Sequence, residues 1–244
     1  MSKANDDPLP PPGLRRPSRR QLQFSLRGFF LVSTILMVWL GFHVHSARRQ
    51  AVARRAILDQ GGQPVFDRQI TGSTPSFVPA GLRSILGEDL FGTVVRLNFP
   101  SGKPENDDCL AALTDLPHVT IINVDGATTI GDEGLTHIAA ADLDCLRLID
   151  ARVTDQGLQQ LRGLKRLTML DLTGNPITDD GLQPLAALER LEYLTLRGTA
   201  VGDAGILRLA GLPKLVYLNV QETRVTPAGV AALQLLLPDC QIVP

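Results

Sequence analysis

Residues 167–188 read LTMLDLTGNPITDDGLQPLAAL, and this stretch decides the fold. Leu170 and Leu172 flank Asp171, so a short strand here would point both leucines to one side and the carboxylate to the other. Further apolar side chains follow, the last three at helical spacing: Ile177, Leu182, Leu185 and Leu188. The stretch therefore predicts a strand, a loop and a short helix that share one leucine core.

The segment between the strand and the helix carries signals of its own. Thr178 and Asp179 offer oxygens that can cap a short helix. Pro184 removes one helical hydrogen bond, which predicts a helix that is short or begins late. We expect Gly181 to allow close backbone packing between neighbouring turns. Aspartates occupy the position of Asp179 in other copies of the stretch, at Asp132, Asp155 and Asp203.

The same unit recurs along the chain at a nearly fixed period. Aligned on the pattern T-D-x-G-L, the glycines lie 23, 24, 24 and 24 residues apart, at Gly134, Gly157, Gly181, Gly205 and Gly229. A weaker first copy places Cys109 at the glycine position. Strand residues keep this step, at Leu146, Leu170, Leu194, Leu218 and Ile242. The period predicts an α/β solenoid over residues 93–244, with parallel strands on one side and short helices on the other.

The end of the array has its own pattern. Residues 235–242 read LLLPDCQI, which predicts a last helix and an edge strand that close the final layer. We expect no second domain after them.

The repeats resemble leucine-rich repeats. Residues 167–188 and the copy at residues 191–212, LEYLTLRGTAVGDAGILRLAGL, carry the resemblance. The I-T-D-x-G-L variant is similar to that of F-box-type and ribonuclease-inhibitor-like families and of bacterial membrane-anchored repeat proteins. This resemblance implies a leucine-rich-repeat fold that binds proteins through the concave strand face.

Two features depart from those families. Their cysteine-containing subtype has Cys where this chain has Thr128, Ala151, Asn175, Thr199 and Thr223. Residues 1–92 also leave no room for an F-box before the repeats, which argues against a ubiquitin-ligase adaptor.

The first third of the chain predicts a membrane segment. Residues 1–23 are rich in Pro and Arg, which predicts a disordered tail. Residues 28–44 carry no formal charge and would form a helix about 25 Å long. Arg27 can snorkel to the headgroups, so we assign residues 24–45 as one transmembrane helix in contact with the lipid bilayer.

The orientation of this helix follows from the flanking basic residues. Six precede it (Lys3, Arg15, Arg16, Arg19, Arg20 and Arg27) and four follow it (Arg48, Arg49, Arg54 and Arg55). The excess favours a single-pass signal anchor with a cytoplasmic N-terminus and the repeats outside the cytoplasm. Two alternatives are a signal peptide cleaved at residues 51–53 and twin-arginine export through residues 18–22.

The membrane helix and the repeats are joined by two further segments. Residues 46–79 predict a juxtamembrane helix over 47–60, ended by Gly61 and Gly62, and then a connector. Residues 80–92 are amphipathic and are our candidate N-terminal cap for the solenoid.

The charge distribution excludes one class of partner. The 244 residues have a net charge of -1, yet residues 1–92 sum to +6 and residues 93–244 to -7. An acidic repeat domain lacks the basic footprint of a nucleic-acid-binding protein, so we expect no nucleic-acid partner. The basic half points to a membrane surface.

Equal strand positions predict three ladders on the strand face. The first ladder is Ile121, Cys145, Met169, Tyr193 and Tyr217. The second is Asn123, Arg147, Asp171, Thr195 and Asn219, and the third is Asp125, Ile149, Thr173, Arg197 and Gln221. Tyrosines flanked by Arg and Asn are typical of protein-binding surfaces, whereas ladder packing alone is the alternative. The predicted protein-binding residues are Tyr193, Tyr217, Met169, Arg147, Asp171, Asn123, Asn219 and Arg197.

No pattern indicates catalysis. The histidines form no nucleophile triad, and His137 is expected to be a half-buried helix residue. Cys145 has only Arg147 nearby to lower its pKa, and the cysteine spacing suggests no metal site, disulfide or cofactor site. We therefore expect a non-enzymatic, membrane-anchored protein-binding module with no small-molecule substrate. The alternatives are a structural, self-associating envelope protein and an enzyme subunit supported by an absent domain.

Overall fold

The computed structural model describes residues 26–67, 93–102, 107–126 and 130–244. The chain forms two compact units, Met1–Phe42 and His43–Pro244. The predicted tail, residues 1–23, and the predicted cap, residues 80–92, lie outside the described residues.

Helix α1 runs from Leu26 to Asp59 without a break. The stretch Phe29–Asp59 contains a window of mean hydropathy 1.6 and is long and apolar enough to cross a membrane. The hydroxyls of Ser33 and Thr34 donate to the Phe30 carbonyl, at 3.0 and 2.7 Å, so both are satisfied inside the apolar stretch. By length and composition α1 fits both a signal anchor and a signal peptide.

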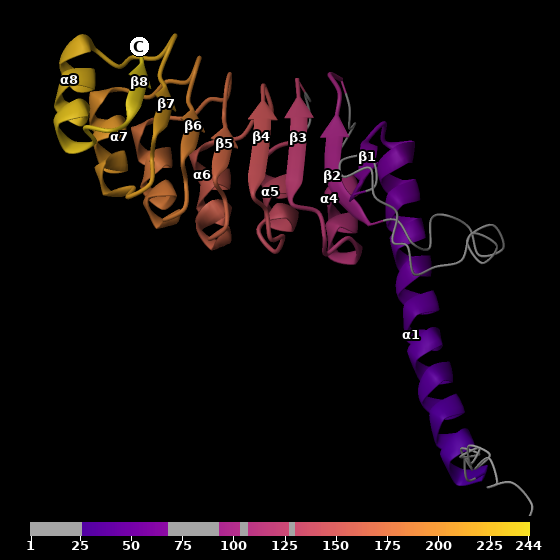
Figure 1. The fold of residues 1–244 in the computed structure, drawn as a ribbon. Coiled ribbons are helices and arrows are strands. Elements are labelled where there is room, and N and C mark those ends of the chain that lie inside the picture. Colours follow the sequence, from indigo (N-terminus) through magenta and orange to yellow (C-terminus); the bar gives the residue numbers. More distant parts are fainter. Residues whose placement is uncertain (1–25, 68–92, 103–106, 127–129) are drawn as a thin grey trace, which may run out of the picture. The chain divides into compact units, whose positions relative to one another are not determined.

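In the second unit, eight strands among the described residues form one sheet in chain order, with the helices on one side of it (Figure 1). β1 and β2 are antiparallel, and every later pair is parallel. The strands are β1 Gln63–Phe66, β2 Val94–Phe99, β3 Ile121–Asp125, β4 Cys145–Ile149, β5 Met169–Asp171, β6 Tyr193–Thr195, β7 Tyr217–Asn219 and β8 Gln241–Val243. The predicted parallel solenoid is confirmed.

Short helices connect successive strands of the solenoid. They are α4 Asp108–Ala111, η2 Ala112–Asp115, α5 Asp132–Ile138, α6 Asp155–Leu158, η3 Gln159–Gly163, η4 Asp179–Ala187, α7 Asp203–Leu207, η5 Arg208–Gly211 and α8 Pro227–Leu236. The η elements are 3-10 helices, and η4 contains Pro184. η4 begins at Asp179, the position equivalent to Asp155 and Asp203 in the neighbouring units, and is nine residues long, so the predicted shortening or late start is not observed. The turn accommodates the proline as a 3-10 helix, whereas the neighbouring turns begin as α-helices.

Leucines fill the space between the strands and the helices. One row is in register across neighbouring strands and fully or almost fully buried: Leu146, Leu170, Leu194 and Leu218. A second buried row is Leu148, Leu172 and Leu196, and Ile177, Leu182, Leu185 and Leu188 bury the helix side of the same unit. The alternation expected at residues 170–172 is thus confirmed.

The N-terminal end of the sheet is covered by the segment predicted to be the juxtamembrane helix. Ala53 and Ile57 of α1 are buried in the core of the second unit. α1 ends as predicted, because the N–H of Gly62 donates to the Ile57 carbonyl at 2.8 Å and Gly61 has a φ of 78°. A Cβ on Gly62 would overlap both Ile57 and Phe99, so only glycine allows this approach.

The strand β1 completes this cover and lies in the segment after Gly62 that was predicted to be a connector without a strand. Val65 of β1 pairs with Arg96 of β2, and the Arg54 guanidinium lies 5.5 Å from the centre of the Phe66 ring. The short apolar run at residues 64–66 forms a strand because β2 offers it a free edge.

The repeated aspartates have a role that differs from the prediction. The Asp155 carboxylate accepts hydrogen bonds from the backbone N–H and the hydroxyl of Thr178 in the next unit. The same link joins Asp132 to Thr154 and Asp203 to Thr226, and Asp179 accepts from the N–H of Gly202 at 2.6 Å. These carboxylates connect neighbouring turns, whereas we expected them to cap their own helices.

The threonine half of the predicted cap is confirmed at two turns. The hydroxyl of Thr154 accepts from the N–H of Gln156, and that of Thr226 accepts from the N–H of Gly229. The two hydrogen bonds that Thr226 donates to Asp203 lower the pKa of this carboxyl below its usual value, because they stabilise its charged form. At the first turn, burial instead raises the pKa of Asp107.

The buried Asn175 replaces the cysteine of the related repeat subtype. Its Oδ1 accepts from the N–H groups of Ala151 and Val153, at 3.2 and 2.9 Å. Its Nδ2 donates to the carbonyls of Leu148 and Leu172, at 2.6 and 3.0 Å. At equivalent positions the hydroxyls of Thr199 and Thr223 each donate to one carbonyl, and Thr128 lies outside the described residues.

The C-terminal end is closed by α8 and the edge strand β8. α8 begins at Pro227, eight residues before the predicted segment 235–242. Thr226 caps the helix, and proline is well accepted in the first turn. Gln234 holds the turn to β8, since its Nε2 donates to the carbonyls of Leu237, Pro238 and Cys240. The predicted closing helix and strand are therefore present, with Leu236 as the last helical residue.

Candidate protein-binding face of the sheet

The face of the sheet turned away from the helices, here called the open sheet face, carries the predicted ladders. Strand register places the first ladder in adjacent positions from Ile121 to Tyr217 and extends it to Arg96 and Gln241. The second ladder is equally adjacent from Asn123 to Asn219. Because equal positions of parallel strands meet, these neighbours follow directly from the period.

The C-terminal half of the first ladder is apolar and exposed. Met169 and Tyr193 are 38% and 42% exposed. The rings of Tyr193 and Tyr217 have centroids 6.3 Å apart and planes tilted by 36°. Such a tilted pair presents ring surface to solvent while the two rings support each other.

Val216 extends this surface and was missed in the sequence analysis. It is 42% exposed and precedes Tyr217, where the equivalent positions in other units hold Asp144, Thr168 and Glu192. The replacement of a polar residue by valine at this position, next to the first ladder, was the signal that would have identified it. We define the apolar patch as Met169, Tyr193, Val216 and Tyr217.

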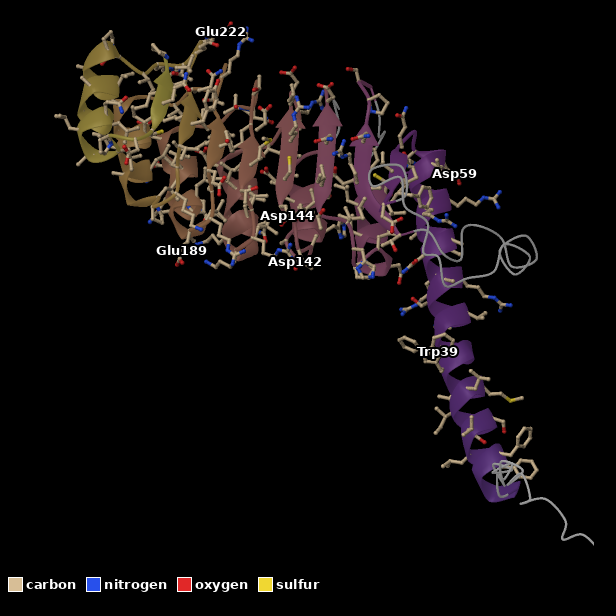
Figure 2. All side chains as sticks on the ribbon, viewed as in Figure 1. Trp39, Asp59, Asp142, Asp144, Glu189 and Glu222 are labelled. Atoms are coloured by element: carbon tan, nitrogen blue, oxygen red, sulfur yellow. The ribbon has the colours of Figure 1, made fainter. Side chains whose placement is uncertain are left out.

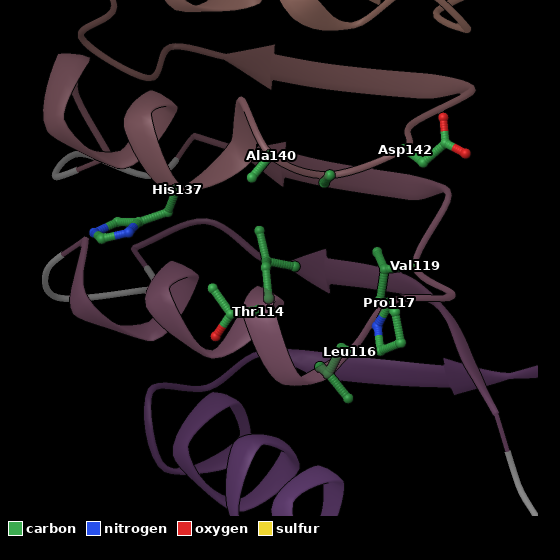
Figure 3. Close-up of a pocket in the computed structure, with 9 residues that line it drawn as sticks. Thr114, Leu116, Pro117, Val119, His137, Ala140 and Asp142 are labelled. Atoms are coloured by element: carbon green, nitrogen blue, oxygen red, sulfur yellow. The ribbon is translucent and has the colours of Figure 1, made fainter. Parts of the chain in front are cut away.

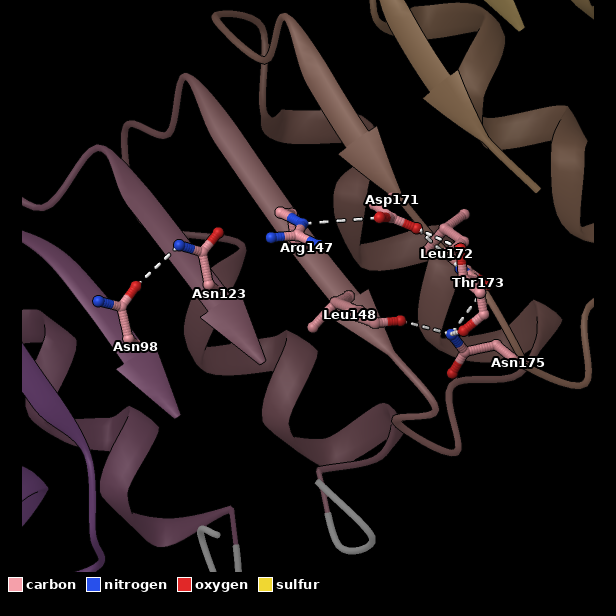
Figure 4. A network of polar contacts seen from close by, with 8 residues as sticks. All are labelled: Asn98, Asn123, Arg147, Leu148, Asp171, Leu172, Thr173 and Asn175. Carbon is pink, nitrogen blue, oxygen red and sulfur yellow. Dashed lines mark hydrogen bonds and ion pairs between the residues drawn. The ribbon is translucent and has the colours of Figure 1, made fainter. Parts of the chain in front are cut away.

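The second ladder is polar from β2 to β5, and its side chains bond to one another (Figure 4). Asn123 Nδ2 donates to Asn98 Oδ1 at 2.8 Å, and Arg147 Nε lies 3.6 Å from Asp171 Oδ2. Asp171 also accepts from the backbone N–H and hydroxyl of Thr173. Its carboxylate is therefore mostly used inside the sheet, whereas the Arg147 side chain is 42% exposed.

The remaining predicted residues lie at one rim of the sheet. Arg197 follows β6 and pairs with Glu222 at 2.6 Å, and Figure 2 shows Glu222 at this rim. The pairing raises the pKa of Arg197 and lowers that of Glu222. Asn219 Oδ1 accepts from the N–H of Gln221 at 2.9 Å. The structure therefore separates Arg197 from the part of the second ladder where Asn123 and Arg147 lie.

The opposite rim carries a second ion-pair group. Arg166 pairs with Asp142 at 2.8 Å and with Asp144 at 3.0 Å, and both aspartates lie at this rim in Figure 2. All three side chains are substantially exposed. Such pairs add little stability, so they contribute mainly to the charge pattern around the face.

The cysteines do not have the properties of reactive thiols. Burial raises the pKa of Cys145, although Arg147 and Arg96 act in the opposite direction. Burial raises the pKa of Cys109 to about 12 and that of Cys240 above its usual value. A thiol with a raised pKa holds little thiolate at neutral pH, which argues against a nucleophilic role for Cys145.

Two small cavities adjoin the first turns. A cavity of about 230 Å³ lies on the open sheet face, lined by Gln63, Asn98, Asn123, Asp125 and Arg147. A second, of about 160 Å³, lies between the first two connecting helices beside the half-buried His137 (Figure 3). Both are smaller than the cavities that hold most small ligands. Among the described residues, no group of three or more His, Cys, Asp or Glu side chains is placed to hold a metal ion.

Comparisons with known proteins agree with this architecture. The family profile described as Leucine Rich repeat matches residues 166–186, which cover the β5–η4 unit. A comparison with curated protein sequences gives no match. The matched unit is a leucine-rich repeat, and the other turns share its strand, loop and short-helix order.

Two solved bacterial structures are similar to the chain. One is a leucine-rich-repeat protein of Leptospira interrogans, with 19% identity, a TM-score of 0.42 and coverage of 54% of this chain. The match spans only 33% of the Leptospira chain. The other is internalin C2 of Listeria monocytogenes, with 21% identity, a TM-score of 0.49 and coverage of 74% of this chain and 87% of that chain.

Proposed function

We propose that this leucine-rich-repeat chain binds a protein partner through the open sheet face. Leucine-rich-repeat domains are generally protein-interaction modules, and this fold is typically non-enzymatic. The apolar patch is the observation that carries the proposal, because Met169, Tyr193 and Val216 are exposed close to one another beside a polar second ladder. A preformed patch of this kind binds without ordering its own backbone.

The residues of the face contribute in different ways to this proposal. Tyr193, Tyr217 and Met169 supply apolar contact area, and Arg147 supplies an exposed guanidinium beside it. Asp171 orients Arg147. Asn123, Asn219 and Arg197 form the polar surroundings, which give specificity more than affinity.

Replacing both tyrosines should remove most of the binding. We expect Tyr193→Ser with Tyr217→Ser to weaken capture of the partner about a hundredfold, since buried aromatic anchors dominate interface energies. The measurement is affinity capture from the native membrane fraction with residues 43–244, which form a compact unit. The captured protein is then titrated against both versions. Circular dichroism checks that the variant remains folded.

The matched control changes two exposed leucines that lie off the open sheet face. Leu207 and Leu235 are 38% and 85% exposed, so Leu207→Ser with Leu235→Ser removes comparable apolar surface elsewhere. Equal capture by the tyrosine variant and the control contradicts the proposal.

A structural, self-associating role is the second candidate, favoured by the exposed Leu235 and Leu236 beside the edge strand β8. Concentration-dependent sedimentation of the unchanged fragment, abolished in the leucine variant alone, would support this candidate.

We also propose that α1 remains attached as a single-pass membrane anchor, with the repeats outside the cytoplasm. Cleavage after Ala53 would cut the helix that covers the N-terminal end of the sheet, because Ala53 and Ile57 are buried there. N-terminal sequencing of the membrane-extracted chain should therefore find residues before Ala53. A chain beginning at Arg54 contradicts the anchor, and protease digestion from outside the sealed membrane checks the orientation.

A further inference from the structure

The part of α1 that belongs to the second unit has two different sides. One side carries Ala53, Arg54 and Ile57, which are buried against the repeat domain. The other carries Arg48, Val52 and Arg55, which are exposed, Val52 by 71%. Positions 48, 52 and 55 share one face of a helix. We call these three residues the basic helix face.

This face is basic in a domain that is otherwise acidic. Residues 43–66 contain four arginines and one acidic residue, Asp59, whereas residues 93–244 carry a net charge of -7. Arg49 pairs with Asp115 at 3.4 Å. No ion pair to Arg48 or Arg55 is found among the described residues, so their guanidinium groups face solvent. The positive charges of Arg48 and Arg55 are therefore concentrated on one helix face and can contact a negatively charged surface.

The position of the basic helix face in the chain brings it near any membrane that α1 enters. Arg48 follows Phe42, the last aromatic residue of the apolar stretch, by six residues. Six residues span at most about 21 Å when fully extended and about 9 Å as a helix. The helical reach places Arg48 within the headgroup layer plus one Debye length, about 15 Å together. Arg55, thirteen residues after Phe42, lies about 20 Å away along the helix, just beyond this distance.

We propose that the basic helix face binds the surface of a bilayer that contains anionic phospholipids. The two guanidinium groups pair with headgroup phosphates, and Val52 lies between them on the same helix face. Each arginine near an anionic surface strengthens binding about fivefold. This interaction is separate from the open sheet face, so it goes beyond the proposed protein binding.

The fragment 43–244 provides a stringent test because its overall charge opposes binding. It contains 18 basic and 23 acidic side chains, a net charge of -5, so an anionic vesicle repels it on average. Co-sedimentation is measured with vesicles of phosphatidylcholine mixed with phosphatidylglycerol and with vesicles of phosphatidylcholine alone. We expect binding to the mixed vesicles only, and weaker binding as the salt concentration rises.

Two matched variants distinguish the effect of the basic helix face on vesicle binding from the effect of the net charge of the fragment. Arg48→Gln with Arg55→Gln should weaken binding to the mixed vesicles about thirtyfold, while Gln preserves the helix propensity. Arg162→Gln with Arg190→Gln makes the same change in net charge at exposed arginines of the repeats and should have little effect. Arg48→Lys with Arg55→Lys should retain binding. Circular dichroism checks the fold of each variant.

Three results would overturn the proposal. They are no binding of the unchanged fragment to the mixed vesicles, equal binding to phosphatidylcholine alone, and equal loss in the two glutamine pairs. None of these results affects the test of the open sheet face, which uses a captured protein.

Discussion

Replacing Asn175 with alanine is expected to lower the free energy of unfolding by about 4 kcal/mol. The amide satisfies the N–H groups of Ala151 and Val153 and the carbonyls of Leu148 and Leu172. Alanine removes the acceptor of the two N–H groups and the side-chain donor to the Leu148 carbonyl, whereas the Leu172 carbonyl still accepts the backbone N–H of residue 175. Each buried group left unpaired costs about 1–3 kcal/mol before the loop relaxes. Denaturant unfolding followed by circular dichroism measures the change.

The loop that Asn175 supports explains why the loss is large. Asp150 and Arg152 flank Ala151 and both have a φ of 49°, a conformation that is unfavourable for residues other than glycine. The hydrogen bonds of the amide hold this loop in place. Without these hydrogen bonds, nothing offsets the unfavourable φ angles of Asp150 and Arg152. We expect the loop to change conformation and expose the leucine core beneath it to water.

A threonine at this position provides the graded comparison. Thr199 occupies the equivalent place one unit later, and its hydroxyl donates to the Leu196 carbonyl at 2.7 Å. We expect Asn175→Thr to cost about half as much as Asn175→Ala, because the hydroxyl still satisfies a carbonyl. Equal stability of the alanine variant and the unchanged chain contradicts this role for Asn175.

Replacing Gly181 with alanine is expected to cost about 3 kcal/mol of stability. A Cβ there would overlap Asp155 Oδ1 and lie 3.0 Å from Ile177 Cγ2. Asp155 would have to move, and its hydrogen bonds to the N–H and hydroxyl of Thr178 would be lost. Denaturant unfolding of the repeat domain measures the cost.

Two controls identify the aspartate as the cause. Gly211 has no atom within 4 Å of its Cβ position, so Gly211→Ala should change stability by no more than about 0.5 kcal/mol. In an Asp155→Ala background, Gly181→Ala should cost about 2 kcal/mol less than in the unchanged chain. A full cost in that background would show that the collision with Ile177 decides the outcome.

Much of the open sheet face was predictable from the period. A step of 23 to 25 residues places Tyr193 beside Tyr217 and Arg147 beside Asp171, because parallel strands bring equal positions together. Exposure was harder to predict. The exposed fraction of Val216 depends on how the neighbouring side chains pack, which the period does not determine. The orientation of Asp171 is set by a hydrogen bond from the Thr173 hydroxyl.

The sequence by itself determined the repeat, its strand register and its buried leucines, because each unit repeats a local pattern and stacks on a neighbour with the same pattern. Only the tertiary structure decided which N–H groups the aspartates accept, since a carboxylate at Asp155 can reach its own helix or the next turn. The tertiary structure also decided which segment covers the edge of β2. β2 needed an apolar partner, and Ile57 and β1 supply it from a distant segment that no local pattern connects to the repeats.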